Sequence, residues 1–225
     1  MIKDNLLNIK AGLPEGVCLV AVSKTKPVSC ITEAYEAGHR DFGENYPQEL
    51  AEKQPQLPAD IRWHFIGHLQ TNKVKLIAPF VTMIHSVDSM HLLKAIDKEA
   101  KHNNRTIDCL LQFHIAEEET KFGLTLDEAV SILESDEYKN LNNIRLCGVM
   151  GMATLTEDPD EVRHEFRNLK FCFDTLKTRF FADSSHFKEI SMGMSHDYRI
   201  AIEEGSTMVR IGSSIFGARI YPNKN

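Results

Sequence analysis

The chain has 225 residues, of which 42% are hydrophobic and 26% are charged, so it can bury a sizeable core and is not expected to be disordered. Lys and Arg number 26 against 32 Asp and Glu, and the net charge of −6 excludes a chain-wide basic surface for nucleic acid. No apolar run approaches the roughly 20 residues of a membrane helix, and the first residues are too charged for a secretion signal. Five scattered cysteines without a CxxC pair are typical of reduced thiols in a cytoplasmic protein, and no His or Cys spacing indicates a metal site.

Short runs rich in Val, Ile, Phe and Leu alternate along the chain with longer runs whose charges recur at helical spacing. The short runs predict eight strands, at Val17–Lys24, Asp41–Glu44, Arg62–Gly67, Met83–Val87, Ile107–Ile115, Arg145–Met150, Phe187–Met192 and Met208–Ile215. The longer runs predict helices at Ser29–Ala37, Gln70–Ala78, Ser89–His102, Leu126–Ser135, Pro159–Phe180 and Asp197–Glu204. Two or three further helical turns are expected within Met1–Gly12.

This alternation predicts a parallel sheet, because strands that are separated by helices cannot pair as hairpins. Eight such units in 225 residues match a (β/α)8 barrel of the TIM type, near the lower end of its size range. A doubly wound open sheet is the alternative. No low-complexity linker divides the chain, so residues 1–225 are expected to form a single domain.

Active sites of such barrels lie at the carboxyl ends of the strands, which directs attention to Lys24 at the end of the first strand. Side chains alternate along a strand, so Lys24 is expected to share the face of Val22. Burial there would lower the pKa of the lysine and free its amine for Schiff-base chemistry. A lysine that extends to the barrel mouth or pairs with a carboxylate fits the position equally well. After the second strand, Glu44 and Asn45 could contact a ligand or cap the next helix.

The exits of the last two strands suit a phosphate, which such barrels often bind there. Ser195 offers a hydroxyl beside backbone N–H groups, Gly212 permits close approach of the backbone, and Ser213 adds a donor. Ordinary helix caps are the alternative for either loop alone. Arg210 lies two residues before Gly212 within the strand, and its permanent charge requires an anion, a ring-nitrogen acceptor or an ion pair.

A lysine nucleophile, a phosphate site and an arginine inside one barrel suit an aldehyde phosphate. Pyridoxal 5′-phosphate (PLP) fits, with its carbonyl joined to Lys24. On these residues alone, a sugar phosphate held by an aldolase lysine fits nearly as well.

Six motifs, in order, carry a resemblance to a known family along nearly the whole chain. They are AVSKTKP at Ala21–Pro27, FGENY at Phe42–Tyr46, WHFIGHLQTNK at Trp63–Lys73, KFG at Lys121–Gly123, SMGMSHD at Ser191–Asp197 and GSTMVRIGSSIFGAR at Gly205–Arg219. The sequence resembles the pyridoxal phosphate homeostasis protein family. The resemblance implies a single barrel like the N-terminal domain of alanine racemase (PLP fold type III), with PLP held as a Schiff base on Lys24.

The resemblance also implies roles for the other candidate residues. Ser195, Gly212 and Ser213 would hold the phosphate, Arg210 would face the pyridine nitrogen, and Asn45 and Met192 would line the pocket. Lys26 is similar to a second family lysine near the rim, to which we assign no role. The family leads us to expect a cytoplasmic monomer that stores, buffers or delivers PLP, with PLP-dependent apo-enzymes as partners and neither nucleic acid nor membrane.

The competing hypothesis is an enzyme, either an amino-acid racemase or a Schiff-base aldolase. The residues that bind the cofactor would look alike in both, so the discriminator is a second acid or base on the opposite face of the ligand. In alanine racemases a tyrosine from a separate C-terminal domain serves that face. Because this sequence ends at Asn225, just after the eighth strand, only Tyr46, Tyr198 and Tyr221 remain as substitutes, and we expect a non-catalytic PLP carrier.

Overall fold

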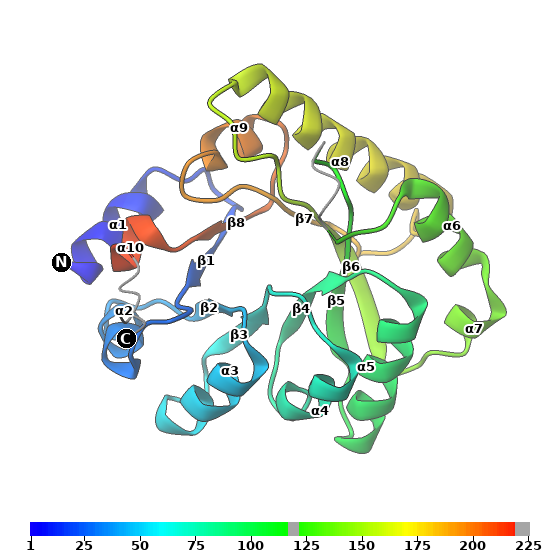
Figure 1. The fold of residues 1–225 in the computed structure, drawn as a ribbon, viewed down its shortest axis with the longest axis horizontal. Coiled ribbons are helices and arrows are strands. Elements are labelled where there is room, and N and C mark those ends of the chain that lie inside the picture. The colour runs from blue at the N-terminus through cyan, green and yellow to red at the C-terminus, as the bar shows by residue number, and fades with distance from the viewer. Residues whose placement is uncertain (117–121, 219–225) are drawn as a thin grey trace, which may run out of the picture.

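The computed structural model describes residues 1–116 and 122–218, and its centre is a closed barrel of parallel strands. The strands follow one another around the ring in chain order, as Figure 1 shows. They are β1 Cys18–Val22, β2 Asp41–Glu44, β3 Arg62–Phe65, β4 Met83–Val87, β5 Ile107–Gln112, β6 Ile144–Met150, β7 Glu189–Ser191 and β8 Met208–Ile211. The last strand pairs with the first, so the predicted (β/α)8 barrel is confirmed and the open sheet was the wrong alternative.

Helices surround the ring of strands (Figure 1). They are α1 Ile2–Ala11, α2 Val28–Glu36, α3 Pro47–Lys53, α4 Val74–Ile77, α5 Met90–His102, α6 Leu126–Glu134, α7 Asp136–Lys139, α8 Pro159–Phe180, α9 Tyr198–Glu203 and α10 Ser213–Phe216, with 3-10 turns η1 Gln54–Gln56 and η2 Thr71–Lys73. The first and last helices lie side by side, and Asn5 Nδ2 donates to Ile215 O at 3.1 Å. Within the part of the chain that the structure describes, no helix is both long and apolar enough to cross a membrane.

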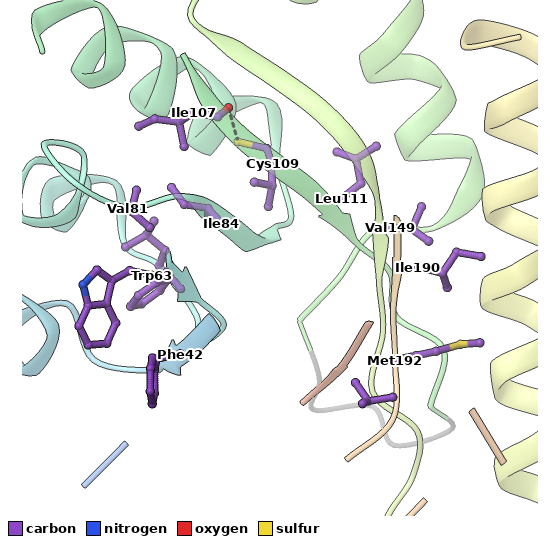
Figure 2. Close-up of a cluster of buried hydrophobic side chains, with 14 of the residues drawn as sticks. Phe42, Trp63, Val81, Ile84, Ile107, Cys109, Leu111, Val149, Ile190 and Met192 are labelled. Atoms are coloured by element: carbon purple, nitrogen blue, oxygen red, sulfur yellow. Dashed lines mark hydrogen bonds between the residues drawn. The ribbon is translucent and has the colours of Figure 1, made fainter. Parts of the chain in front are cut away.

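Alternation along the strands divides the apolar side chains into two layers. Residues such as Ala21, Phe42 and Val149 point outward and pack beneath the helices, and Figure 2 shows part of this outer layer. A second, smaller cluster fills the barrel itself, with Val20, Met83, Leu110, Cys147, Met150 and Met208. Each fully buried side chain of this kind contributes roughly 1.5–3 kcal/mol to folding, so the scaffold that carries the strand ends is rigid.

The ends of β1 and β8 differ from the prediction, and both differences bear on the site. The first strand ends at Val22 instead of Lys24, because residues 23–26 form a turn in which Lys26 N donates to Ser23 O at 3.1 Å. Thr25 in that turn has φ +63°, a left-handed conformation that cannot continue a strand. The last strand ends at Ile211, and the residues from Ser213 turn into α10.

Three helices were not predicted, and one predicted helix is divided. The unpredicted α3, α7 and α10 are short, with seven, four and four residues, which is too few for a repeating hydrophobic spacing, and α10 lies where the last strand was expected to continue. The predicted helix Gln70–Ala78 consists of the 3-10 turn η2 followed by a single turn of α-helix, α4. The ten-residue α1 agrees with the turns expected at the start of the chain.

Candidate functional site

A cavity of about 210 Å³ opens at the carboxyl ends of the strands, where barrel sites are expected. Its walls come from the exits of six strands and from the start and end of α10. They are formed by Val22, Lys24, Lys26, Asn45, Ile66, Met152, Met194, Ser195, Arg210, Gly212, Ser213 and Gly217. Six of the seven predicted site residues are therefore brought together, and all the charged groups among these lining residues are basic.

The exit of β1 supplies both lysines. Val22 and Lys24 lie two residues apart and both line the cavity, as strand alternation predicts. The side chain of Lys24 is half-buried and lines the cavity, so it is partly covered by protein and can still be reached from the cavity. The Nζ of Lys26 donates to Ala218 O at 2.8 Å, which ties the exit of β1 to the segment after α10.

Arg210 enters the cavity from β8, on the inward face of the barrel. It is only 4% exposed, and burial lowers the pKa of its guanidinium to about 10, so it stays protonated at neutral pH. Nη1 donates to Ser191 Oγ at 2.7 Å and Nη2 to Gly151 O at 3.0 Å. A hydroxyl and a carbonyl thus orient the guanidinium without cancelling its charge.

Behind Arg210, a buried hydrogen-bond chain crosses the barrel interior. His85 Nδ1 lies 2.9 Å from Ser191 Oγ, and His85 Nε2 lies 2.9 Å from His64 Nδ1. His64 Nε2 in turn lies 3.1 Å from Asp41 Oδ1. Burial holds the pKa of His85 well below its ordinary value, so this ring is neutral and adds no charge beside Arg210.

The loops after β7 and β8 touch each other through Ser195 and Gly212. Gly212 N donates to Ser195 Oγ at 3.3 Å, and Ser213 follows directly as the first residue of α10. A Cβ on Gly212 would come within 3.1 Å of Val22 O, so a larger residue would crowd the floor of the cavity. Two hydroxyls and adjoining backbone therefore converge on one corner, which is the kind of donor set that a phosphate requires.

The lining residues fit the group that the resemblance implies. Val22, Ile66, Met152 and Met194 provide apolar walls for a flat ring, while the serine corner and the basic groups suit its phosphate. Asn45 adds a buried side-chain oxygen that has no hydrogen-bond partner among the described residues. A buried polar atom of this kind normally has a partner, so it points to a polar ligand group in the cavity.

Comparison with known proteins agrees with this geometry. Residues 1–220 match the family model of the alanine racemase N-terminal domain. A pyridoxal phosphate homeostasis protein from Aquifex aeolicus is 42% identical over 205 residues, which span 90% of this chain and 87% of that protein. A protein of the same name from Escherichia coli K12 is 38% identical over 215 residues, 94% of this chain and 89% of that one. The chain belongs to the pyridoxal phosphate homeostasis protein family.

Two kinds of barrel among solved structures are similar to this family member. PipY from Synechococcus elongatus PCC7942, solved with PLP bound, superposes with a TM-score of 0.87 at 34% identity, covering 96% of this chain and all of that one. An alanine racemase from Clostridium difficile 630 superposes with a TM-score of 0.76 at 17% identity, covering 99% of this chain and 57% of the racemase. The second likeness shows the shared fold alone.

One residue predicted for the pocket of this homeostasis-family barrel lies elsewhere. Met192 is fully buried in the outer layer between strands and helices (Figure 2) and does not line the cavity. Alternation explains this position, because the preceding Ser191 points inward to Arg210 and the next side chain must point outward. Met194 takes the place in the cavity wall that was predicted for Met192.

Two of the three candidate tyrosines lie in the described part of the chain, and neither lines the cavity. Tyr46 is 52% exposed, and neither it nor Tyr198 belongs to the cavity wall. Tyr221 lies outside the described residues, as do Lys121 and Arg219 at the ends of two of the motifs. The sequence assigned no site role to Ile66, Met152 and Gly217, because apolar and small residues at strand exits resemble ordinary packing.

Proposed function

We propose that this protein binds PLP as a Schiff base on Lys24 and stores, buffers or delivers it to PLP-dependent apo-enzymes, as a cytoplasmic monomer that is not itself an enzyme. One observation carries the proposal: a single cavity contains Lys24, the buried Arg210 and the apposed Ser195 and Ser213 loops. The homeostasis proteins among its relatives and the PLP-bound PipY support the same conclusion.

Each group in the cavity has a distinct part in this proposal. When bound, PLP supplies an aldehyde carbonyl and an electron-withdrawing ring. Lys24 is the amine for the carbonyl, and the hydroxyls of Ser195 and Ser213 hold the phosphate at the other corner. The buried side-chain oxygen of Asn45 would accept a hydrogen bond from a polar group of the ring.

Arg210 favours binding over catalysis. Its guanidinium only donates hydrogen bonds and remains protonated, so a pyridine nitrogen facing it accepts a hydrogen bond and stays unprotonated. An unprotonated ring withdraws electrons weakly, which makes removal of an α-proton from an amino acid difficult. The lining residues provide only lysines as bases, whereas racemisation requires acid–base groups on both faces.

Visible absorbance before and after borohydride reduction tests the cofactor and its attachment. Purified protein supplied with PLP should show an absorbance band that borohydride abolishes, and peptide mass mapping should place the reduced adduct on Lys24. An adduct on Lys26 or Lys73 would refute the assignment. The aldolase alternative makes a different prediction, namely colourless protein that borohydride labels only when a sugar phosphate is present.

Incubation of the PLP-loaded protein with L-alanine in deuterium oxide tests the absence of catalysis. We expect no more than trace deuterium at the α-carbon, because Arg210 keeps the ring a weak electron acceptor. Mass spectrometry with chiral separation measures the product. Steady, multiple-turnover formation of deuterated D-alanine, lost in Lys24→Ala, would establish a racemase in place of a carrier.

A further inference from the structure

A buried ion cluster lies on the outer side of the β1 exit, away from the cavity. Lys53, the last residue of α3, places its Nζ 2.7 Å from Glu44 Oε1 and 2.6 Å from Glu49 Oε1. The side chains of Lys53 and Glu44 are 8% and 0% exposed. Such a cluster is unusual for a residue at the end of a surface helix, and neither the proposed binding of PLP nor the cavity lining accounts for it.

The cluster holds the residues on both sides of Lys24. Before it, Ser23 O accepts a hydrogen bond from Lys53 Nζ at 2.9 Å, and Ser23 Oγ donates to Glu44 Oε1 at 2.6 Å. After it, Thr25 N donates to Glu49 Oε1 at 2.6 Å. Both carboxylates pair with the ammonium of Lys53, so Lys53 links the hydrogen bonds at Ser23 to the hydrogen bond at Thr25. We call this cluster of Glu44, Glu49 and Lys53 the clamp.

The backbone between Ser23 and Thr25 is strained. Thr25 has φ +63°, and a β-branched residue adopts this left-handed conformation only when its surroundings impose it. The hydrogen bond to Glu49 supplies that constraint on the residue directly after Lys24. If it were released, Thr25 would relax toward the extended region and the direction of the Lys24 side chain would change.

The chemistry of the cluster also favours a positioning role over a stabilising one. Buried ion clusters are weak contributors to stability, because desolvation of the charges offsets their attraction. Burial raises the pKa of Glu44, and the nearby Lys53 ammonium opposes that rise. Lys53 therefore favours the charged form of the buried carboxylate, which accepts the hydrogen bond from Ser23.

We propose that Lys53 is a positioning residue that, through Glu44 and Glu49, holds the turn around Lys24 so that its amine points into the cavity. The inference rests on the proposed attachment of PLP to Lys24. It predicts that the clamp affects only the covalent part of binding, because the phosphate corner follows β7 and β8, Arg210 lies in β8, and none of these residues is a partner of Lys53.

Two ligands and two variants test the clamp. Pyridoxamine 5′-phosphate carries an amine where PLP has its aldehyde, so it cannot join Lys24 and reports on the rest of the cavity. Lys53→Met should weaken retention of PLP about tenfold, because an amine that no longer points into the cavity forms a less stable adduct, and should slow formation of the reducible adduct. Titration should show an unchanged affinity for pyridoxamine 5′-phosphate. Glu49→Ala, at a partly exposed position that folding tolerates, should give the same pattern.

Lys170→Met is the matched control, because it removes an ammonium that pairs with Asp174 on the surface of α8, and it should bind both ligands as wild type does. Parallel loss of both ligands in Lys53→Met and Glu49→Ala would overturn the positioning role and indicate a general disturbance of the barrel. Wild-type retention of PLP by both variants would also overturn it. Failure of the wild-type protein to form a reducible adduct on Lys24 would instead overturn the proposed function.

Discussion

The two ends of the barrel use charge in opposite ways. At the amino end, arginines pair with acids from neighbouring strands, Arg62 with Asp41 at 2.5 Å and Arg145 with Asp108 at 2.7 Å. At the carboxyl end, the charged residues of the cavity wall are Lys24, Lys26 and Arg210. The amino end also has a hollow, of about 410 Å³, so a cavity alone does not distinguish the two. The sign of the lining charges distinguishes the two ends. Among the described lining residues, the cavity at the carboxyl end has basic groups and serine hydroxyls but no acids, whereas the hollow at the amino end includes acids.

The hydrogen-bond chain through His64 and His85 connects these ends. It starts at Asp41, which also pairs with Arg62, and it ends at Ser191, which accepts a hydrogen bond from Arg210. Asp41 at the amino end is therefore linked, through two histidines, to the hydroxyl that orients Arg210.

The strongest test compares one lysine from each end. Lys24→Ala should remove the absorbance band and the reducible adduct completely, because it deletes the amine that forms the Schiff base. Lys10→Ala removes a lysine that lines the amino-end hollow and should leave both signals at wild-type strength. Absorbance spectra of the two variants, recorded before and after borohydride and after equal loading with PLP, measure both signals. Equal loss in both would mean that the two ends are not functionally distinct.

A buried histidine at the amino end should make stability sensitive to acid. His39 is buried there, and burial lowers its pKa from the usual 6.5 to about 4. Between these values the unfolded chain binds a proton that the folded chain does not, so the free energy of unfolding should fall as the pH drops from 6.5 to 4, by about 3 kcal/mol. The depressed pKa of His85 acts in the same direction.

Urea denaturation at about pH 7 and pH 4 measures this loss. His39→Gln removes the titrating ring and should lose about 3 kcal/mol less than the wild type between the two pH values. Stabilisation by carboxylates such as Asp41, whose pKa lies below its usual value, is lost only at still lower pH. An identical loss in the variant and the wild type would show that His39 does not carry the effect.

At the carboxyl end, the effect of Ser195 and Ser213 on PLP binding can be measured separately from their effect on stability. Ser195→Ala and Ser213→Ala should each weaken retention of PLP about tenfold to a hundredfold, since a hydrogen bond to a charged group is worth roughly 1.5–3 kcal/mol. The melting temperature should change little. Ser206→Ala provides the contrast, because the buried Ser206 hydroxyl contacts the carbonyls of Ile190, Met192 and Met208 and should affect stability before affinity. Wild-type retention in both corner variants would disprove the phosphate assignment.

The sequence predicts the barrel well because its signals are local and periodic. Each strand is a short apolar run, and Lys24 lines the cavity together with Val22 as expected, although the strand itself ends at Val22. Side-chain alternation also explains why the assignment of Met192 to the pocket was wrong. Ser191 points inward, so the next side chain, Met192, must point outward. Family resemblance alone does not reveal this difference.

The clamp around Lys24 could not be predicted from local pattern. Glu49 and Lys53 are four residues apart, which suggests an ordinary surface ion pair on a helix. Burial of Lys53 depends on how α3 packs against the β1 exit, and that packing brings together residues up to thirty positions apart in the chain. A left-handed threonine is likewise invisible in sequence, because the residue type argues against that conformation.

The smallest expected effect concerns an ion pair at the amino end. Arg145 donates to Asp108 through Nε at 2.7 Å and Nη2 at 3.0 Å, but its side chain is 50% exposed. Exposed pairs are screened by water and salt, so Arg145→Ala should reduce the free energy of unfolding by no more than about 1 kcal/mol, and less at high salt. Because the pair has no contact with Arg210 or the serine corner, retention of PLP should stay within about twofold of wild type. Denaturation and PLP titration of the same preparation measure both quantities, and a tenfold loss of affinity would show that charge at the amino end reaches the site and that the two ends are not independent.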